Sequence, residues 1–335
     1  MDETERKQLA RKRLTSVLTK HVIANLRTLE QKISDAGPNN QRIDPHILTP
    51  VRKAMEEEGV VARRSAGSNT WYYLGNTSQD LVETRLVQQV ADFKAFTGNK
   101  IPQRIGQALE IATYRALMQG NIPEFFGRYT NLDAHDDSTL YSKQEPPQYI
   151  GGLSLPGDQC LDFMVRHDEA GYLGLECKNI REWLYPHRTE ILETLAKCVA
   201  LNCVPVIIAR RIPFVTFKLM SACGVIVHQT YNQLMAHADA AVAARVKHKD
   251  SLGYHDIRLG NLPDSRLLKF IGTDMMNVAP DARQKFDKFK DLLQAFSSET
   301  ISYPAFAAKV RRRLAGKNEE KDDTDDEYID FQEFG

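Results

Sequence analysis

The 335-residue chain lacks long apolar runs and has few cysteines. No stretch approaches the roughly 18 uninterrupted apolar residues that a membrane-spanning helix needs. Residues 1–7 are largely charged, where a secretory signal would turn apolar. The five cysteines are odd in number and form no Cys-x-x-Cys pair, so neither a disulfide framework nor a zinc site is indicated. We therefore expect a cytoplasmic protein with reduced cysteines, no membrane partner and no small-molecule cofactor.

The chain has no net charge, with 44 basic and 44 acidic residues, but the two signs are unevenly distributed. Residues 318–335 hold nine acidic residues and one lysine, a net charge of −8, which leaves +8 on the rest. A basic body with an acidic tail is frequent in proteins that meet polyanions, and it also serves solubility. We expect the tail to be disordered. It either mimics nucleic-acid charge at a basic site or keeps the protein soluble.

The N-terminal region has a helical pattern. Apolar residues recur every three or four positions over residues 4–35, which predicts one long helix. A short segment opens at Asp44-Pro45. Thr49-Pro50 then has the form of an N-cap and first helical position, and the helix that it begins is expected to end at Gly59.

A hairpin pattern follows these helices. Residues 60–64 and 71–74 have strand character and flank the polar turn residues 65–69. Helix, short helix, helix and hairpin in this order resemble a winged helix-turn-helix, which implies that the helix over residues 49–58 enters a DNA groove. The alternative is a module for protein contact or dimerisation, which the acidic run 56–58 favours. The basic residues expected to contact DNA here are Arg52, Lys53, Arg63 and Arg64.

Two strand patterns in the middle of the chain carry acidic residues. Leu161, Phe163 and Val165 alternate with other residues, so Asp162 is expected on the opposite face of a strand. Residues 172–178 alternate too, which places Glu176 and Lys178 together on one face. Glu-x-Lys also occurs three times elsewhere, in helical or acidic-tail sequence, so the strand context supplies the specificity.

Helical and strand patterns surround these two strands. A helix beginning at Ile101 has Glu110 beside its apolar stripe, and Gly106, one turn earlier, leaves that side chain room to reach a neighbouring strand. Residues 121–160 show no sustained period and form either a long loop or short strands. An amphipathic helix over residues 191–199 precedes an apolar strand run, 204–209.

The order of these elements resembles the PD-(D/E)xK nuclease superfamily, most of all its Mrr-type and Holliday junction resolvase branches. The order is a helix with an acidic residue, two strands that carry Asp and Glu-x-Lys, a helix and a strand. The resemblance covers residues 100–235 and implies an α/β fold, a restriction-endonuclease-like αβββαβ core. It also implies that Asp162, Glu176 and Glu110 hold Mg²⁺ or Mn²⁺ and that Lys178 orients or activates the attacking water. Leu161 stands where the proline that names the motif would precede Asp162.

This resemblance divides the chain into a winged helix over 1–78, a nuclease-like core over 79–235, a helical C-terminal region over 236–317 and the tail over 318–335. The expected function is metal-dependent DNA cleavage of the restriction or defence type. The alternatives are a junction resolvase or repair nuclease, and a non-cutting DNA-binding regulator on a nuclease scaffold. Cutting both strands needs two active sites, so a homodimer is expected. His187 and Arg188, near the start of the later helix, are further candidates for DNA contact, with a solvated helix start as the alternative.

Overall fold

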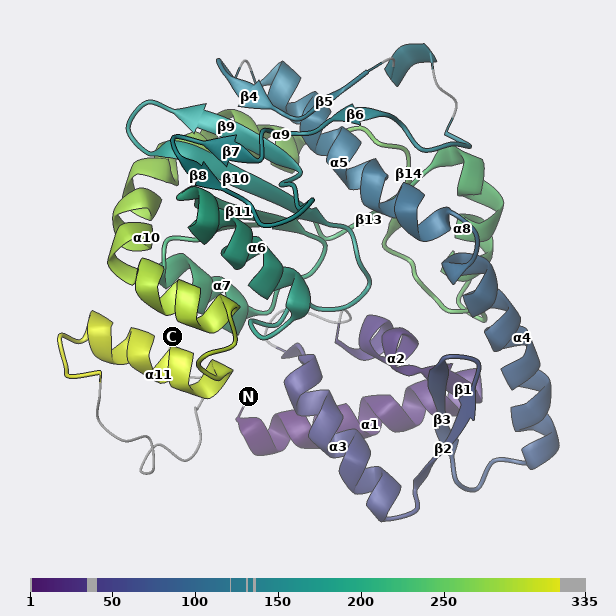
Figure 1. The fold of residues 1–335 in the computed structure, drawn as a ribbon. Coiled ribbons are helices and arrows are strands. Elements are labelled where there is room, and N and C mark those ends of the chain that lie inside the picture. Colours follow the sequence, from purple (N-terminus) through teal and green to yellow (C-terminus); the bar gives the residue numbers. More distant parts are fainter. Residues whose placement is uncertain (1, 35–40, 121, 131, 135–136, 320–335) are drawn as a thin grey trace. The chain divides into compact units, whose positions relative to one another are not determined.

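The structure is a computed structural model that describes residues 2–34, 41–120, 122–130, 132–134 and 137–319. The chain forms two compact units. The first contains residues 1–102 and 237–259, and the second contains residues 103–236 and 260–335. Helices and small sheets occur in both, so the expected mixed α/β class is confirmed (Figure 1). Of the predicted acidic tail, residues 320–335 lie outside the described residues.

The first unit packs helices against a three-stranded antiparallel sheet of order β1-β3-β2. Its helices are α1 (Glu3–His21), α2 (Leu26–Ile33), α3 (Pro45–Glu57), α4 (Gln79–Thr97) and α8 (Ala240–Lys247), and its strands are β1 (Ile23–Asn25), β2 (Val61–Ala66), β3 (Asn69–Leu74) and β14 (Ile257–Leu259). The apolar side chains of α1, α2 and α3 share one core, to which Leu14, Leu29 and Met55 belong. Burial of these side chains stabilises the helices more than their intrinsic propensity does.

The single helix predicted over residues 4–35 is wrong, because the chain breaks at Val22. Val22 has a φ of +67°, which a β-branched residue rarely adopts. β1 follows and pairs with β3. Asn25 then caps α2, since its side chain accepts a hydrogen bond from the backbone N–H of Thr28 at 2.9 Å. Apolar periodicity is the same on both sides of the break, so the pattern alone does not reveal it.

The helix start predicted at Thr49-Pro50 is also wrong. α3 begins at Pro45, at a position where the missing N–H costs nothing, and Pro50 lies inside the helix. The helix tolerates this internal proline because buried side chains on both sides of it anchor α3 in the core, among them Leu48, Val51 and Met55.

The predicted hairpin is confirmed, with strands β2 and β3 slightly longer than expected. Trp71 of β3 is fully buried and meets the Phe93 ring of α4 edge-on, at 6.3 Å between ring centroids. Its indole N–H donates to the Ala66 carbonyl at 3.1 Å. Trp71 is therefore a core residue.

The second unit is built on a five-stranded sheet of order β12-β11-β10-β9-β4. β4 and β10 each pair antiparallel with β9, whereas β10, β11 and β12 run parallel. The sheet strands are β4 (Phe125–Phe126), β9 (Phe163–His167), β10 (Gly171–Lys178), β11 (Val204–Ala209) and β12 (Ile226–Gln229). Residues 121–160 contain short strands, namely β5 (Arg128–Tyr129), β6 (Lys143–Gln144), β7 (Tyr149–Ile150) and β8 (Leu153–Ser154), and β13 (Gln233–Met235) follows β12.

Helices cover both faces of this sheet (Figure 1). They are α5 (Ile101–Gln119), α6 (Thr189–Leu201), α7 (Phe214–Ala222), α9 (Ser265–Lys269), α10 (Met275–Ser297) and α11 (Tyr303–Leu314), with a π-helical turn at Phe270–Asp274 joining α9 to α10. α5 packs on the face that presents Phe163 and Leu175, and α6 packs on the face that presents Ile207. No helix among the described residues is long and apolar enough to cross a membrane.

Candidate active site

Asp162 lies one residue before β9. The predicted strand alternation is wrong at this point: Leu161 packs with Cys198 of α6, whereas Phe163 packs in the core on the α5 face. The Asp162 carboxylate accepts a hydrogen bond from the Cys177 N–H at 2.6 Å, and its own N–H donates to the Leu175 carbonyl at 3.1 Å. These two bonds fix Asp162 against the end of β10, although it is not part of a strand.

The alternation predicted for β10 is confirmed. Leu175 and Cys177 enter the α5-side core, while Glu176 and Lys178 lie on the other face. Glu176 is only 1% exposed, and both of its oxygens accept from lysines. Lys178 Nζ lies 2.7 Å from Oε2, and Lys197 Nζ of α6 lies 2.6 Å from Oε1. A buried carboxylate needs such partners, because burying an ionised group without them costs far more than the roughly 2–7 kcal/mol of an unpaired neutral amide or hydroxyl.

Lys197 also links Glu176 to the segment that leads into Asp162. Its ammonium donates to the Cys160 carbonyl at 2.7 Å while it holds Glu176. Lys197 was not predicted from the sequence. The sequence feature that could have indicated Lys197 is its position on an amphipathic helix, at the border of the apolar stripe. A lysine at such a position can reach a residue of the strand on which the helix packs.

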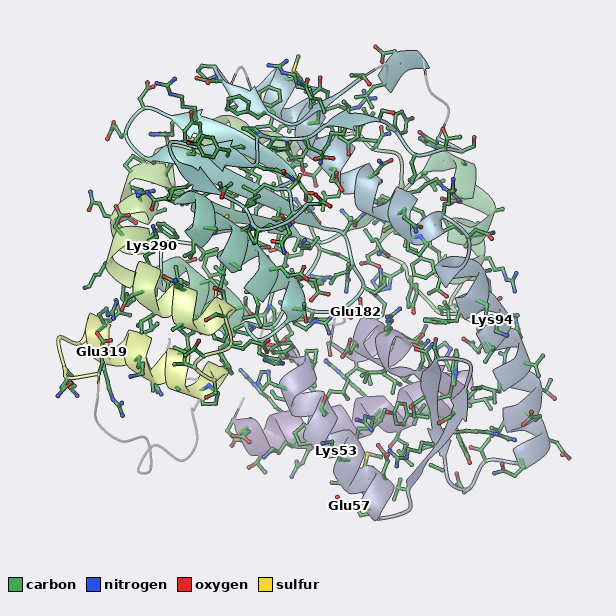
Figure 2. The ribbon with its side chains drawn as sticks, in the orientation of Figure 1. Lys53, Glu57, Lys94, Glu182, Lys290 and Glu319 are labelled. Carbon is green, nitrogen blue, oxygen red and sulfur yellow. The ribbon has the colours of Figure 1, made fainter. Side chains whose placement is uncertain are left out.

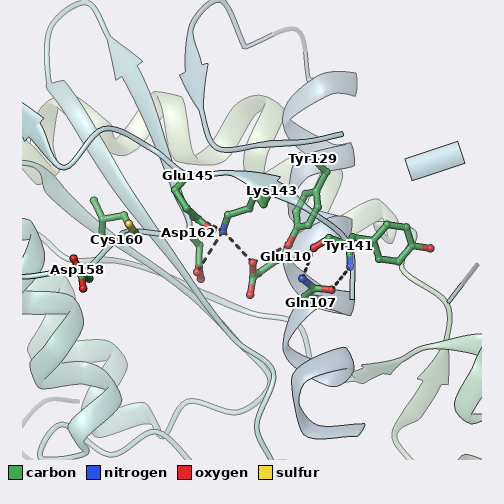
Figure 3. A pocket seen from close by; sticks show the side chains of 10 residues that line it. Gln107, Glu110, Tyr129, Tyr141, Lys143, Glu145, Asp158, Cys160 and Asp162 are labelled. Carbon is green, nitrogen blue, oxygen red and sulfur yellow. Dashed lines mark hydrogen bonds and ion pairs between the residues drawn. The ribbon is translucent and has the colours of Figure 1, made fainter. Parts of the chain in front are cut away.

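Glu110 projects from α5 and shares an ammonium with Asp162. Its Oε2 atom accepts from the Tyr129 hydroxyl at 2.8 Å and from Lys143 Nζ at 3.1 Å. The same Nζ lies 3.9 Å from Asp162 Oδ1 and 3.1 Å from Glu145 Oε2 (Figure 3). The Lys143 side chain is only 7% exposed. Lys143 was also missed, because it lies on a two-residue strand that has no periodic signal.

A cavity of about 440 Å³ opens beside these groups. Glu110, Asp162 and Lys143 line it (Figure 3). The other lining residues are Gln107, Tyr129, Tyr141, Glu145, Asp158, Cys160 and Leu161. The wall is therefore strongly polar, which suits a charged and hydrated ligand better than an apolar one.

The charges of the site perturb one another. Burial, together with the charges of Glu176 and Glu110, raises the pKa of Asp162 well above its usual range. Burial lowers the pKa of Lys178, but the charges of Glu176 and Asp162 outweigh it and raise that pKa overall. The pKa of Lys143 is raised in the same way by Glu110, Asp162 and Glu145. The carboxylates thus repel one another and strongly favour a cation between them.

The chemistry of the donor set fits a hard divalent cation, since Mg²⁺ and Mn²⁺ prefer carboxylate oxygens. In the arrangement of the described residues, however, no three His, Cys, Asp or Glu side chains converge closely enough to hold a metal ion. Glu110 and Asp162 both face the lysine ammonium of Lys143 instead. Coordination by these two carboxylates therefore requires Lys143 to move.

The basic residues predicted to contact DNA from the first unit differ in exposure. The Arg52 guanidinium lies 4.5 Å from the centroid of the Tyr72 ring and pairs with Glu56, so it is a packed side chain. Lys53 is exposed on α3 (Figure 2). The Arg63 side chain is 70% exposed, and Arg64 pairs with Glu83 at 2.5 Å.

The basic residues of the second unit also divide into packed and exposed groups. His187 is exposed and lies near the Tyr303 ring, at 5.8 Å between ring centroids, and Arg188 pairs with Glu190 at 2.8 Å. Arg210 is 2% exposed and donates to the carbonyls of residues 180 and 181, which makes it structural. His228 of β12 stacks on the Phe270 ring, at 4.3 Å between ring centroids, so it is also a packed side chain.

Comparisons of the chain with protein-family models, curated proteins and solved structures find no match.

Proposed function

We propose that this protein is a metal-dependent DNA endonuclease with a PD-(D/E)xK-type core. The observation that carries the proposal is the juxtaposition of Glu110, Asp162, Glu176 and Lys178. These residues come from a helix, the bend before one strand and the end of the next strand. Their mutual electrostatic coupling and the adjacent polar cavity fit a site for a divalent cation and a phosphodiester.

The order of elements supports this fold assignment. α5, β4, β9, β10, α6 and β11 follow one another along the chain, and their strands are neighbours in one sheet. This is the αβββαβ order that the resemblance implies, with the short strands β5 to β8 inserted between β4 and β9. Glu176 and Lys178 come from the last positions of the central strand β10.

The proposed chemistry assigns a role to each residue. Asp162, Glu176 and Glu110 would hold the cation, which supplies Lewis-acid stabilisation of the charge that develops on the phosphate. Lys178, held 2.7 Å from Glu176, would orient the attacking water. Lys197 would fix the Glu176 carboxylate from the other side, as a positioning residue.

The first unit would bind the DNA. Its order α1-β1-α2-α3-β2-β3 and its sheet order β1-β3-β2 support a winged-helix assignment. α3 is then the groove-binding helix, with Lys53 and the exposed Arg63 near phosphates. We leave Arg52 out of this interface because it is packed against Tyr72. Figure 2 also shows Glu57 on α3, one turn after Lys53, so the surface of α3 is not uniformly basic.

A non-cutting DNA-binding regulator is the second candidate. The observation that favours it is that lysines already neutralise the carboxylates: Lys178 and Lys197 pair with Glu176, and Lys143 pairs with Glu110. Such a site could be a stable ion-pair network without a catalytic role. The two candidates predict the same DNA binding and differ only in metal-dependent hydrolysis.

Cleavage of a DNA panel tests the proposal. Plasmid, modified and unmodified genomic DNA, a four-way junction and single strands are incubated with Mg²⁺ or Mn²⁺ and with wild type, Lys178→Met or Lys218→Met. Lys218, on α7, is a matched control outside the site. We expect wild type and Lys218→Met to cut, and Lys178→Met to lose cutting while it still binds DNA.

Preference for duplex substrates would support the restriction type, and preference for the junction would support a resolvase. Conversion of plasmid directly to linear product would support a dimer that cuts both strands. Binding without cutting by wild type would favour the regulator.

A further inference from the structure

We propose that Lys143 occupies the cation position of the site and that a divalent metal binds by displacing it. This inference rests on the proposed function and identifies the residue that controls metal entry. It concerns Lys143 alone, because this is the lysine that joins Glu110 to Asp162 across the cavity.

The position of the Lys143 ammonium is one that a cation favours. Its Nζ atom lies 3.1 Å from Glu110 Oε2 and 3.9 Å from Asp162 Oδ1. These are two of the three carboxylates proposed as metal ligands. A divalent ion between the same oxygens would carry twice the charge and could approach them more closely, at about 2.0–2.1 Å for Mg²⁺. Lysine and metal therefore compete for the same carboxylate oxygens.

The strand that carries Lys143 is short, and a further carboxylate lies on the side to which the ammonium can withdraw. β6 consists of two residues and pairs with β5 through a ladder of the same length. Glu145, two residues further along, is half-exposed and already lies 3.1 Å from the Lys143 ammonium. It offers the displaced lysine a partner at the rim of the cavity, so the ammonium keeps one carboxylate when it leaves the other two.

The other two lysines of the site have a different geometry. Lys178 and Lys197 both bind Glu176, one on each oxygen, and neither lines the cavity. A carboxylate oxygen has two lone pairs, so Glu176 can keep both lysines and still reach a cation. Metal binding therefore requires displacement of Lys143 and leaves Lys178 and Lys197 in place.

The test compares Mn²⁺ binding by the full-length wild type, Lys143→Met and the control Lys218→Met, using isothermal titration calorimetry without DNA. Methionine keeps most of the aliphatic stem and removes the charge. We expect Lys143→Met to bind Mn²⁺ at least tenfold more tightly than wild type and Lys218→Met. Asp162→Asn in the Lys143→Met background should abolish this tight binding, which assigns it to the site.

Thermal unfolding with and without Mn²⁺ gives a second readout. Without the lysine, Glu110 and Asp162 repel each other, so the variant should gain a larger rise in Tm on Mn²⁺ addition than wild type gains. Lys143→Gln serves as a second variant if the methionine variant does not fold.

The outcomes separate this inference from the proposed function. Mn²⁺ binding that is sensitive to Asp162→Asn but equal or weaker in Lys143→Met would overturn the competition and leave the metal site standing. Failure of folded wild type and folded Lys143→Met to bind Mn²⁺ at all would overturn the metal site, and the inference with it.

Discussion

The two central carboxylates of the site should respond in opposite directions to the loss of their charge. Glu176 is buried, and each of its oxygens is held by a lysine, at 2.7 and 2.6 Å. Asp162 accepts one backbone hydrogen bond and lies 3.9 Å from its nearest ammonium, and its raised pKa shows that its environment disfavours the charged form. Glu176→Gln should therefore destabilise the protein, whereas Asp162→Asn should be neutral or stabilising.

The size of each stability change follows from the charged groups that contact the two carboxylates. Removal of one member of a buried ion pair costs about 3–5 kcal/mol, and the partial exposure of Lys178 (17%) and Lys197 (15%) places Glu176→Gln at the low end, about 3 kcal/mol. For a unit of this size that lowers Tm by roughly 6–12 °C. In Asp162→Asn, the side-chain oxygen can still accept the hydrogen bond from the Cys177 N–H, and the repulsion from Glu176 and Glu110 is relieved. Relief of such repulsion raises the free energy of unfolding by about 0.5–1 kcal/mol, which raises Tm by roughly 1–4 °C.

Differential scanning calorimetry of the full chain, in buffer free of divalent metal, measures both effects. Asp158→Asn, on the exposed rim of the cavity, is the matched control. It should change the free energy of unfolding by less than about 0.5 kcal/mol. If Asp162→Asn lowered Tm as much as Glu176→Gln does, the electrostatic account of the site would be refuted.

Three further predictions concern the packing and the interface. Burial lowers the pKa of His228 to about 4; because an unfolded histidine titrates near 6.5, its contribution is fully present above pH 6.5 and is lost as pH falls toward 4. Urea unfolding at pH 7.5 and 4.5 should show up to about 3 kcal/mol less stability at the lower pH, and a His228→Phe variant whose pH dependence equals that of wild type would contradict this. Gly224→Ala should destabilise by more than about 3 kcal/mol in the same urea assay, because φ is +82° and the new Cβ would lie 2.3 Å from the Phe286 nitrogen; a milder effect would count against this packing. In fluorescence anisotropy with duplex DNA, Arg63→Ala should weaken binding several-fold and flatten the salt dependence of the affinity. Arg52→Met should lower Tm and leave the affinity for DNA nearly unchanged. The reverse pattern would argue against the proposed interface.

The sequence predicts best the elements whose apolar period is long and regular. β10, β11, α5 and α6 lie where their patterns indicate, because each buries a continuous stripe or face. The breaks in the N-terminal helices could not be predicted in this way. The apolar period of residues 4–35 continues across Val22, and the N-cap signature of Thr49-Pro50 is overridden by tertiary burial.

The site was only partly predictable for a different reason. Glu176 and Lys178 share a strand face by simple alternation, so their proximity follows from local sequence. Lys143 meets Glu110 across 33 residues, and Lys197 meets Glu176 across 21. Those contacts depend on how a two-residue strand and a helix pack in three dimensions, and no local period encodes that packing.

Cleavage of supercoiled plasmid DNA with excess Mn²⁺ by wild type and Asp162→Asn is the most direct test of the proposed function. Asp162→Asn is suited to it because we expect this variant to be at least as stable as wild type, so a loss of cutting would not reflect unfolding. The account predicts that wild type nicks or linearises the plasmid, that a chelator stops it, and that the variant is inactive. Equal cutting by the variant, or no cutting by wild type that binds the same DNA, would contradict it.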